Sequence, residues 1–198
     1  MDANVMAPIF SQHLNQYIYE VWPARPELNN IKELIQVHGN DIVEATSINA
    51  DTQADGLISY ADEVLCIRTA DCLPVCFTSN KGHALIHAGW RGIAKEILLD
   101  DKLKQISPET IYIGPHIRAL NYEVSAEFTK NFPKSNNFKE IEGRIFFDIS
   151  QEAIDQLSKN YPQSEIIDCG IDTYSHTDFY SYRNGDIEKR NWNVLRKI

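Results

Sequence analysis

The segment LPVCFTSNKGHALIHAGWRG, Leu73–Gly92, sets the architecture that we expect for this chain. It contains two short apolar runs, 73–79 and 83–88, which are rich in strand-forming residues and separated by turn residues. After Gly92 the apolar spacing changes, and residues 93–106 predict an amphipathic helix of modest length. Two strands followed by a helix are therefore expected at this point.

The flanking segments continue this mixture of strands and helices. Further strands are expected at 55–60, 63–68, 110–115, 144–149, 178–183 and around Trp192, and helices at 125–132 and 149–161, the latter capped by Asp148 or Ser150. Strands and helices do not alternate strictly, which favours an α+β fold over a doubly wound sheet. We expect one domain over residues 1–198, a mixed β-sheet packed with helices.

Charge and composition exclude several classes of protein. The net charge of −9 argues against a nucleic-acid binder or an anionic-membrane binder, although local arginines could still bind a small anion. No apolar run approaches the roughly 20 residues of a membrane span. The N-terminal MDANVMAPIF has no basic region, so no signal peptide is expected.

The four cysteines, Cys66, Cys72, Cys76 and Cys169, form a poor disulfide framework, because three of them cluster in one apolar region. We expect reduced thiols and a cytoplasmic protein. Cys66 and Cys76 are assigned to the core.

His87 lies at the end of an apolar run and is followed by Ala-Gly, which allows a tight turn. On a strand, His83 would lie roughly 13 Å away on the same face, too far to share a metal ion. His38 and Cys72 are the candidate partners, because each lies beside an apolar segment at a strand or loop boundary. Two imidazoles and a thiolate suit zinc, and three protein ligands leave a fourth position for water or substrate.

Each of these residues also has a structural interpretation. Cys72 alone could fill the core, and a histidine at a strand end is often a satisfied polar residue. Trp90 is interpreted as a packing residue, and Arg91 as either a surface ion pair or an anion site. Spacing alone leaves the metal and the structural interpretations open.

A set of short motifs carries a resemblance to a known family. The motifs are QVHG, ADGLIS, TADCLPV, HAGWRG, IGPHI, YEV and FYSYR, most clearly over residues 36–183. In this order and at these intervals they resemble the YfiH-type laccase-domain family, also labelled multicopper polyphenol oxidase or purine nucleoside phosphorylase. The resemblance implies an architecture similar to that of cytotoxic necrotizing factor, and one zinc ion per chain held by His38, Cys72 and His87. Copper is disfavoured, because a laccase needs several copper centres and the chain has six histidines.

The resemblance further implies a purine nucleoside enzyme. It would phosphorolyse adenosine, inosine, guanosine or methylthioadenosine and deaminate adenosine, with nucleoside and phosphate as its small-molecule partners. Asp71 and Cys72 are the candidate catalytic residues, Asp71 either as an acid–base group or as a carboxylate that orients an imidazole. Arg91, Arg183 and Ser181 are the candidate phosphate-binding residues.

The chain departs from the family pattern in three places. The usual N-terminal Thr-x-Arg-x-Gly-Gly-x-Ser is replaced by IFSQHLNQY, for which Arg25 is a candidate substitute. Asp172-Thr173 replaces Cys-Thr, and His116 occupies a position that is usually small and is a candidate substrate contact.

Two alternatives stay open at this stage. One is a cysteine or zinc hydrolase that edits a peptidoglycan precursor, with Cys72 as nucleophile and His87 as base. The other is a non-catalytic protein that binds a nucleoside or a partner. The sequence does not indicate an oligomeric state.

Overall fold

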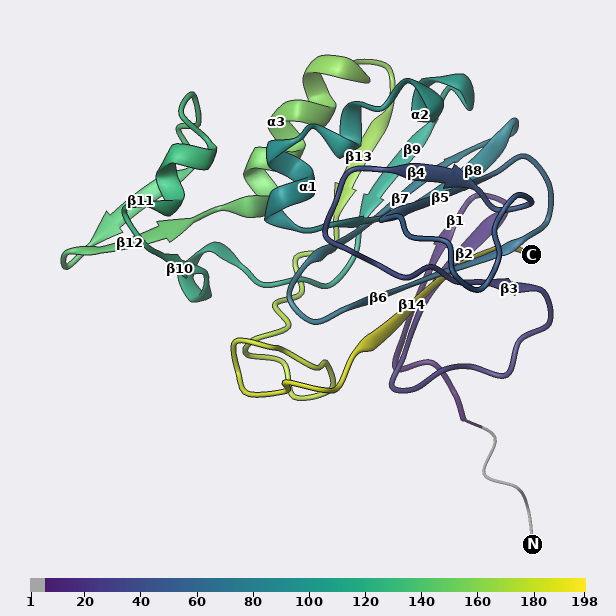
Figure 1. Ribbon diagram of the computed structural model, residues 1–198, viewed down its shortest axis with the longest axis horizontal. Coiled ribbons are helices and arrows are strands. Elements are labelled where there is room, and N and C mark those ends of the chain that lie inside the picture. Colours follow the sequence, from purple (N-terminus) through teal and green to yellow (C-terminus); the bar gives the residue numbers. More distant parts are fainter. Residues whose placement is uncertain (1–5) are drawn as a thin grey trace, which may run out of the picture.

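The computed structural model describes residues 6–198. The prediction about a signal peptide used residues 1–10, of which the first five lie outside the described residues. A six-stranded sheet, β13-β9-β7-β8-β5-β4, forms the middle layer (Figure 1). Helices cover one of its faces, and a five-stranded sheet, β1-β2-β14-β6-β3, packs on the other. A small sheet, β10-β12-β11, projects from the body. This mixed arrangement confirms the predicted α+β class.

The strands are β1 (Phe10–Leu14), β2 (Tyr17–Trp22), β3 (Ile31–Lys32), β4 (Ile42–Glu44), β5 (Gly56–Ser59), β6 (Val64–Thr69), β7 (Leu73–Ser79), β8 (Gly82–Ala88), β9 (Thr110–Ile113), β10 (Glu123–Val124), β11 (Phe138–Ile141), β12 (Arg144–Phe147), β13 (Glu165–Asp168) and β14 (Asn191–Lys197). The helices are α1 (Trp90–Ala94), α2 (Asp101–Gln105) and α3 (Ile149–Asn160), with short 3-10 turns η1 (Ile97–Leu99), η2 (Ala119–Asn121) and η3 (Phe128–Asn131). No helix within residues 6–198 is long and apolar enough to cross a membrane.

The two strands predicted at 73–79 and 83–88 are present as β7 and β8. They pair antiparallel inside the middle sheet, and every residue of both is buried. Val75 and Phe77 belong to the apolar cluster on the helical side, whereas Cys76 belongs to the cluster between the two sheets. Burial on both faces explains why these strands are apolar throughout instead of alternating. In this pair His87 lies opposite Pro74.

The predicted helix at 93–106 is wrong as a single element. The chain forms α1, η1 and α2 in succession and breaks at Glu96, whose φ of 61° is left-handed. Asp100 then starts a new helix by accepting a hydrogen bond from the Lys102 N–H. A single straight helix would place its apolar residues along one face. The three short elements α1, η1 and α2 instead each bury their own apolar residues.

Two further predictions are corrected. Residues 125–132 contain only the 3-10 turn η3, and residues 178–183 form turns instead of a strand. In the segment 178–183, the side-chain amide of Asn191 makes two hydrogen bonds with the backbone of Tyr180. It donates to the Tyr180 carbonyl oxygen and accepts from the Tyr180 N–H. Side-chain bonds thus replace the ladder that the strand prediction assumed. The helix expected after Asp148 is present, and the Asp148 carboxylate caps it.

Candidate functional site

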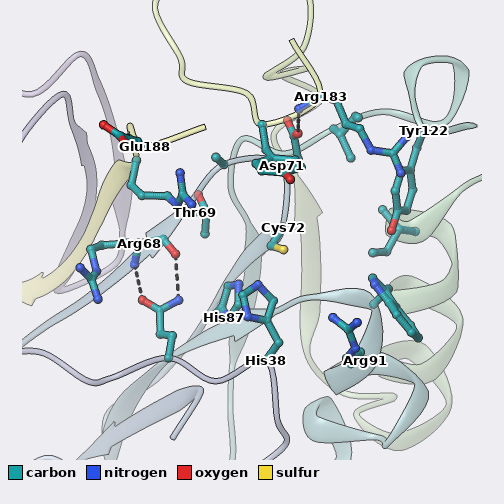
Figure 2. A pocket seen from close by; sticks show the side chains of 17 residues that line it. His38, Arg68, Thr69, Asp71, Cys72, His87, Arg91, Tyr122, Arg183 and Glu188 are labelled. Atoms are coloured by element: carbon teal, nitrogen blue, oxygen red, sulfur yellow. Dashed lines mark hydrogen bonds between the residues drawn. The ribbon is translucent and has the colours of Figure 1, made fainter. Parts of the chain in front are cut away.

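A cavity of about 670 Å³ opens where β6 runs into β7 and β8 runs into α1 (Figure 2). Residues from four loops and from the ends of these strands line it. They are Gln36, His38, Arg68, Thr69, Ala70, Asp71, Cys72, His87, Trp90, Arg91, Ile117, Tyr122, Ile149, Tyr182, Arg183, Glu188 and Arg190. This cavity contains all three predicted metal ligands.

One donor atom from each of His38, Cys72 and His87 lies within 4.8 Å of the other two. His87 is buried at the end of β8, and Cys72 directly precedes β7, next to the residue pair that joins Leu73 to Ala88. His38 comes from the 36–39 loop, with a left-handed φ of 56°. The β7–β8 ladder therefore places two donors, and a separate loop adds the third.

Two glycines of the HAGWRG motif make this convergence possible. A Cβ on Gly89 would lie 3.2 Å from Cys72 Sγ and 3.4 Å from the His38 ring. A Cβ on Gly92 would lie 2.8 Å from the Gly39 carbonyl oxygen, which would displace the loop that carries His38. The glycines allow the ligand-bearing segments to approach one another.

Asp55, which sequence reasoning missed, contacts the His87 imidazole and the backbone of the loop that carries His38. It is fully buried, and its Oδ1 lies 2.7 Å from His87 Nδ1. The same carboxylate accepts hydrogen bonds from the backbone N–H groups of Val37, His38 and Gly39, at 3.3, 3.0 and 2.6 Å. Bonding at Nδ1 leaves His87 Nε2 directed at the site, the arrangement that carboxylates impose on metal-binding histidines.

The charges around the triad support the deprotonated thiol that a metal requires. Burial by itself raises the pKa of the Cys72 thiol, but the charge of His87 and hydrogen bonds with both imidazoles hold that pKa below its ordinary value. Burial likewise opposes protonation of His87, yet Cys72 and Asp55 raise the pKa of its imidazole. A borderline-soft N₂S donor set with a depressed thiol pKa fits a zinc ion.

Arg91 and Arg183 lie on one side of the triad, beside Tyr122 (Figure 2). The Arg91 guanidinium stacks 4.5 Å above the Trp90 ring, and that of Arg183 lies 4.9 Å above Tyr122. Within residues 6–198 neither guanidinium forms an ion pair with a carboxylate. Both charges are thus oriented by aromatic rings and available to an anion.

Asp71 also lines the cavity, but it does not hold an imidazole. Its carboxylate accepts hydrogen bonds from the Thr173 hydroxyl and from the Arg183 backbone N–H, both at 2.8 Å. These bonds attach the loop that carries Arg183 to the end of β6. Of the two predicted roles for Asp71, the imidazole-orienting position is occupied by Asp55.

The two predicted substrate contacts His116 and Ser181, and the candidate substitute Arg25, are not among the cavity-lining residues. His116 is fully buried, with Nδ1 near the Gly114 carbonyl and Nε2 near Arg118. Ser181 is buried too, and its hydroxyl accepts from the Asn184 backbone. Arg25 pairs with Glu33 at 2.6 Å. Bonds within the protein account for each of these side chains.

The opposite side of the triad carries Thr69, Arg68 and Glu188, which sequence reasoning did not assign (Figure 2). The backbone of Arg68 is fixed by the Gln36 side chain, which donates to its carbonyl and accepts from its N–H. Thr69 lies directly before Ala-Asp-Cys in the sequence. Sequence reasoning missed it because a threonine that lines a cavity and a threonine in the core have the same local sequence pattern.

Comparisons with known proteins identify similar chains. A purine nucleoside phosphorylase of Aquifex aeolicus is 31% identical over 140 residues, 67% of this chain and 66% of the relative. The purine nucleoside phosphorylase YfiH of Shigella flexneri is 34% identical over 163 residues, 76% of this chain and 67% of the relative. The chain thus spans about two thirds of the length of these curated relatives.

The fold is shared with a solved structure, the crystal structure of Bacillus licheniformis YfiH. It superposes with a TM-score of 0.80 over 100% of this chain and 98% of that chain, at 18% identity. A family model described as multi-copper polyphenol oxidoreductase laccase matches residues 20–193, which include the three candidate metal ligands and all the residues that line the cavity. The chain therefore belongs to the multi-copper polyphenol oxidoreductase laccase family, to which the resemblance of its motifs pointed.

Proposed function

We propose that this protein is a zinc-dependent purine nucleoside enzyme, which phosphorolyses adenosine, inosine, guanosine or methylthioadenosine and deaminates adenosine. The observation that carries the proposal is the convergence of His38, Cys72 and His87 in a cavity that also presents Arg91 and Arg183, each stacked on an aromatic ring and without a carboxylate partner in the described part of the chain. The names of the two relatives support the same class of reaction.

Zinc is the proposed metal, despite the copper in the family's description. A thiolate with two imidazoles suits zinc, and a zinc ion bound there would supply a Lewis acid beside the substrate. Within the described residues this triad is the one group of three or more candidate ligands that lie close together. A multi-copper oxidase needs several copper centres, so the donor inventory of residues 6–198 favours one metal per chain.

In phosphorolysis, Arg91 and Arg183 would bind inorganic phosphate and hold one oxygen toward the anomeric carbon of the ribose. A bond forms between that oxygen and C1′ while the bond from C1′ to the purine nitrogen breaks. The purine leaves with the electron pair of the broken bond and takes up a proton, and ribose 1-phosphate is the second product. Asp71 lines the same cavity and is the proposed proton-transfer group, which adenosine deamination also requires.

A cysteine hydrolase is the second candidate, and Asp55 gives it a specific basis. Asp55, His87 and Cys72 form a carboxylate–imidazole–thiol series, the arrangement that activates a cysteine nucleophile. Cys72 would then attack an acyl carbon of a cell-wall precursor, and water would release the product. This function requires a metal-free thiol, so metal content separates the two candidates.

The test is chromatographic product analysis with purified protein of measured metal content. Adenosine and inosine are incubated with and without phosphate, beside Cys72→Ala and a Cys169→Ala control whose thiol does not line the cavity. We expect free base that depends on phosphate, and inosine from adenosine without it, both abolished in Cys72→Ala and kept in Cys169→Ala. A zinc-loaded protein that forms neither product contradicts the proposal. Hydrolysis of a peptidoglycan precursor by the metal-free protein, lost in Cys72→Ala, would favour the hydrolase.

A further inference from the structure

A chain of buried hydrogen bonds ends at the Thr69 hydroxyl, on the wall of the cavity. Thr69 is the last residue of β6, is 1% exposed, and lines the cavity. Its hydroxyl contacts the amide of Asn193, which in turn contacts the hydroxyl of Tyr19. Asn193 and Tyr19 are themselves 1% and 0% exposed. None of these three residues is a candidate metal ligand, and none lies on the side of the cavity formed by Arg91 and Arg183.

The direction of each bond in this chain is fixed by one backbone group. Asn193 Nδ2 lies 3.0 Å from the Asn191 carbonyl oxygen, which can only accept, so this atom is the amide nitrogen. Its second hydrogen is donated to Thr69 Oγ1, also at 3.0 Å. The Asn193 oxygen accepts from the Tyr19 hydroxyl at 2.6 Å. Thr69 therefore acts as an acceptor within the protein, and its own proton is left to donate.

Two observations concern the ends of this series of bonds. A Cβ at Gly114 would overlap the Tyr19 hydroxyl, so the missing side chain makes room for that hydroxyl. Among residues 6–198 no group accepts a hydrogen bond from the Thr69 hydroxyl. Buried donors are normally satisfied, and this one borders a cavity, so its partner is expected to be a bound ligand.

The position of Thr69 indicates which part of the ligand it meets. Thr69 lies on the opposite side of the triad from Arg91 and Arg183 (Figure 2). Displacement with inversion at a sugar carbon places the nucleophile and the leaving group on opposite faces of the ring. If phosphate lies between the stacked guanidinium groups of Arg91 and Arg183, the leaving purine extends toward Thr69.

We propose that Thr69 donates a hydrogen bond to an acceptor atom of the purine leaving group, an inference that rests on the proposed phosphorolysis. When the bond to C1′ breaks, its electron pair moves into the purine ring and makes the ring acceptors more negative. The hydrogen bond therefore strengthens toward the transition state and contributes to kcat more than to KM. Thr69 is thus a catalytic residue on the base side of the cavity.

The experiment measures kcat and KM for inosine phosphorolysis in zinc-loaded wild type, Thr69→Val and Thr69→Ser. Valine matches the shape of threonine without the hydroxyl, whereas serine keeps the hydroxyl. Thr78→Val is the control, because Thr78 is equally buried and bonds the Thr110 carbonyl away from the cavity. We expect kcat to fall about 10- to 100-fold in Thr69→Val with KM changed less than about threefold, and wild-type kcat in Thr78→Val.

The outcomes separate this inference from the function on which it rests. Near-wild-type kcat in Thr69→Val, or an equal loss in Thr69→Ser, overturns the role of the hydroxyl while leaving the phosphorylase intact. Thr69→Val also removes the acceptor of the Asn193 amide, so kcat is compared per bound zinc in folded protein. A kcat that returns to the wild-type value on this basis would show a structural role instead. A wild type that cannot phosphorolyse any of the four nucleosides overturns the proposed function and, with it, this inference.

Discussion

The cavity has two walls that are built by different means. The β7–β8 wall, which places Cys72 and His87, is a regular ladder buried on both faces. The wall formed by residues 169–190 has no strand or helix, and side chains hold it in place. Asp172, for example, accepts from the backbone N–H of Arg118 and from the side chains of Asn121 and Ser175.

We expect the β7–β8 wall to determine mainly the stability of the protein and the loop wall to determine mainly substrate binding. The ladder wall is rigid because apolar burial and backbone bonds reinforce each other, so it can hold metal ligands at fixed distances. The loop wall exposes most of residues 181–190, including Tyr182, Arg183 and Glu188, and its contacts are polar. Changes in the ladder are expected to act on unfolding, and changes in the loop wall on substrate binding.

The largest expected effect is on the ladder. Leu85→Ala, in β8, should lower the free energy of unfolding by about 2–5 kcal/mol, because it leaves a cavity among residues that cannot collapse onto it. Urea unfolding measures this loss. Ile187→Ala, in the loop wall, is the control, since Ile187 is 57% exposed, and it should change stability by less than about 0.5 kcal/mol. Similar values for both variants would contradict the contrast between the walls.

Asp55→Asn should weaken metal binding about 10- to 100-fold, because Asp55 orients one ligand and holds the loop of another. The carboxylate accepts from the backbone N–H groups of residues 37–39 and contacts His87 Nδ1. In the asparagine variant the NH₂ group would therefore face a backbone N–H, and two donors cannot bond each other. Competition with a chromogenic chelator measures the affinity. Asp41→Asn, an exposed change in the neighbouring loop, should leave it unaltered. Wild-type affinity in Asp55→Asn would show that the triad needs no such support.

The smallest expected effect lies in the loop wall. Arg183→Lys should raise the KM for phosphate about 3- to 10-fold, because lysine keeps the charge but loses the planar, stacked fork of donors. The free energy of unfolding should stay within about 0.5 kcal/mol, since the Arg183 side chain is exposed. Arg144→Lys, on β12 away from the cavity, serves as the matched control. A loss of stability with unchanged KM would reverse the roles assigned to the walls.

The same contrast explains which sequence predictions held. Strands β7 and β8 were predictable because two-sided burial leaves an apolar run in the sequence. The single helix expected over 93–106 was not, because its break at Glu96 depends on how Leu98 and Leu103 meet the sheet. Local periodicity records which residues are buried, but not where the chain must turn to bury them.

Within the site, the sequence predicted that His38, Cys72 and His87 come together, because two histidines and a cysteine at strand and loop boundaries form a typical set of metal ligands. Asp55 lay inside a quoted motif, yet its partners are set by tertiary structure and no local pattern names them. His116 and Ser181 were predicted as ligand contacts but bond to the protein. A polar residue type does not reveal whether its partner is a substrate or the chain itself.

The bonds of Asp55 also bear on the order in which this protein is assembled. They join positions 16 to 32 residues apart, and every ligand lies between positions 38 and 87. The far wall instead depends on bonds spanning 102 and 112 residues, and the Tyr19–Asn193 bond spans 174. Short-range contacts close at lower entropic cost and form sooner than long-range ones. We therefore expect the nascent chain to acquire its metal-binding half first, and the ability to hold a substrate only after its last strand has been made.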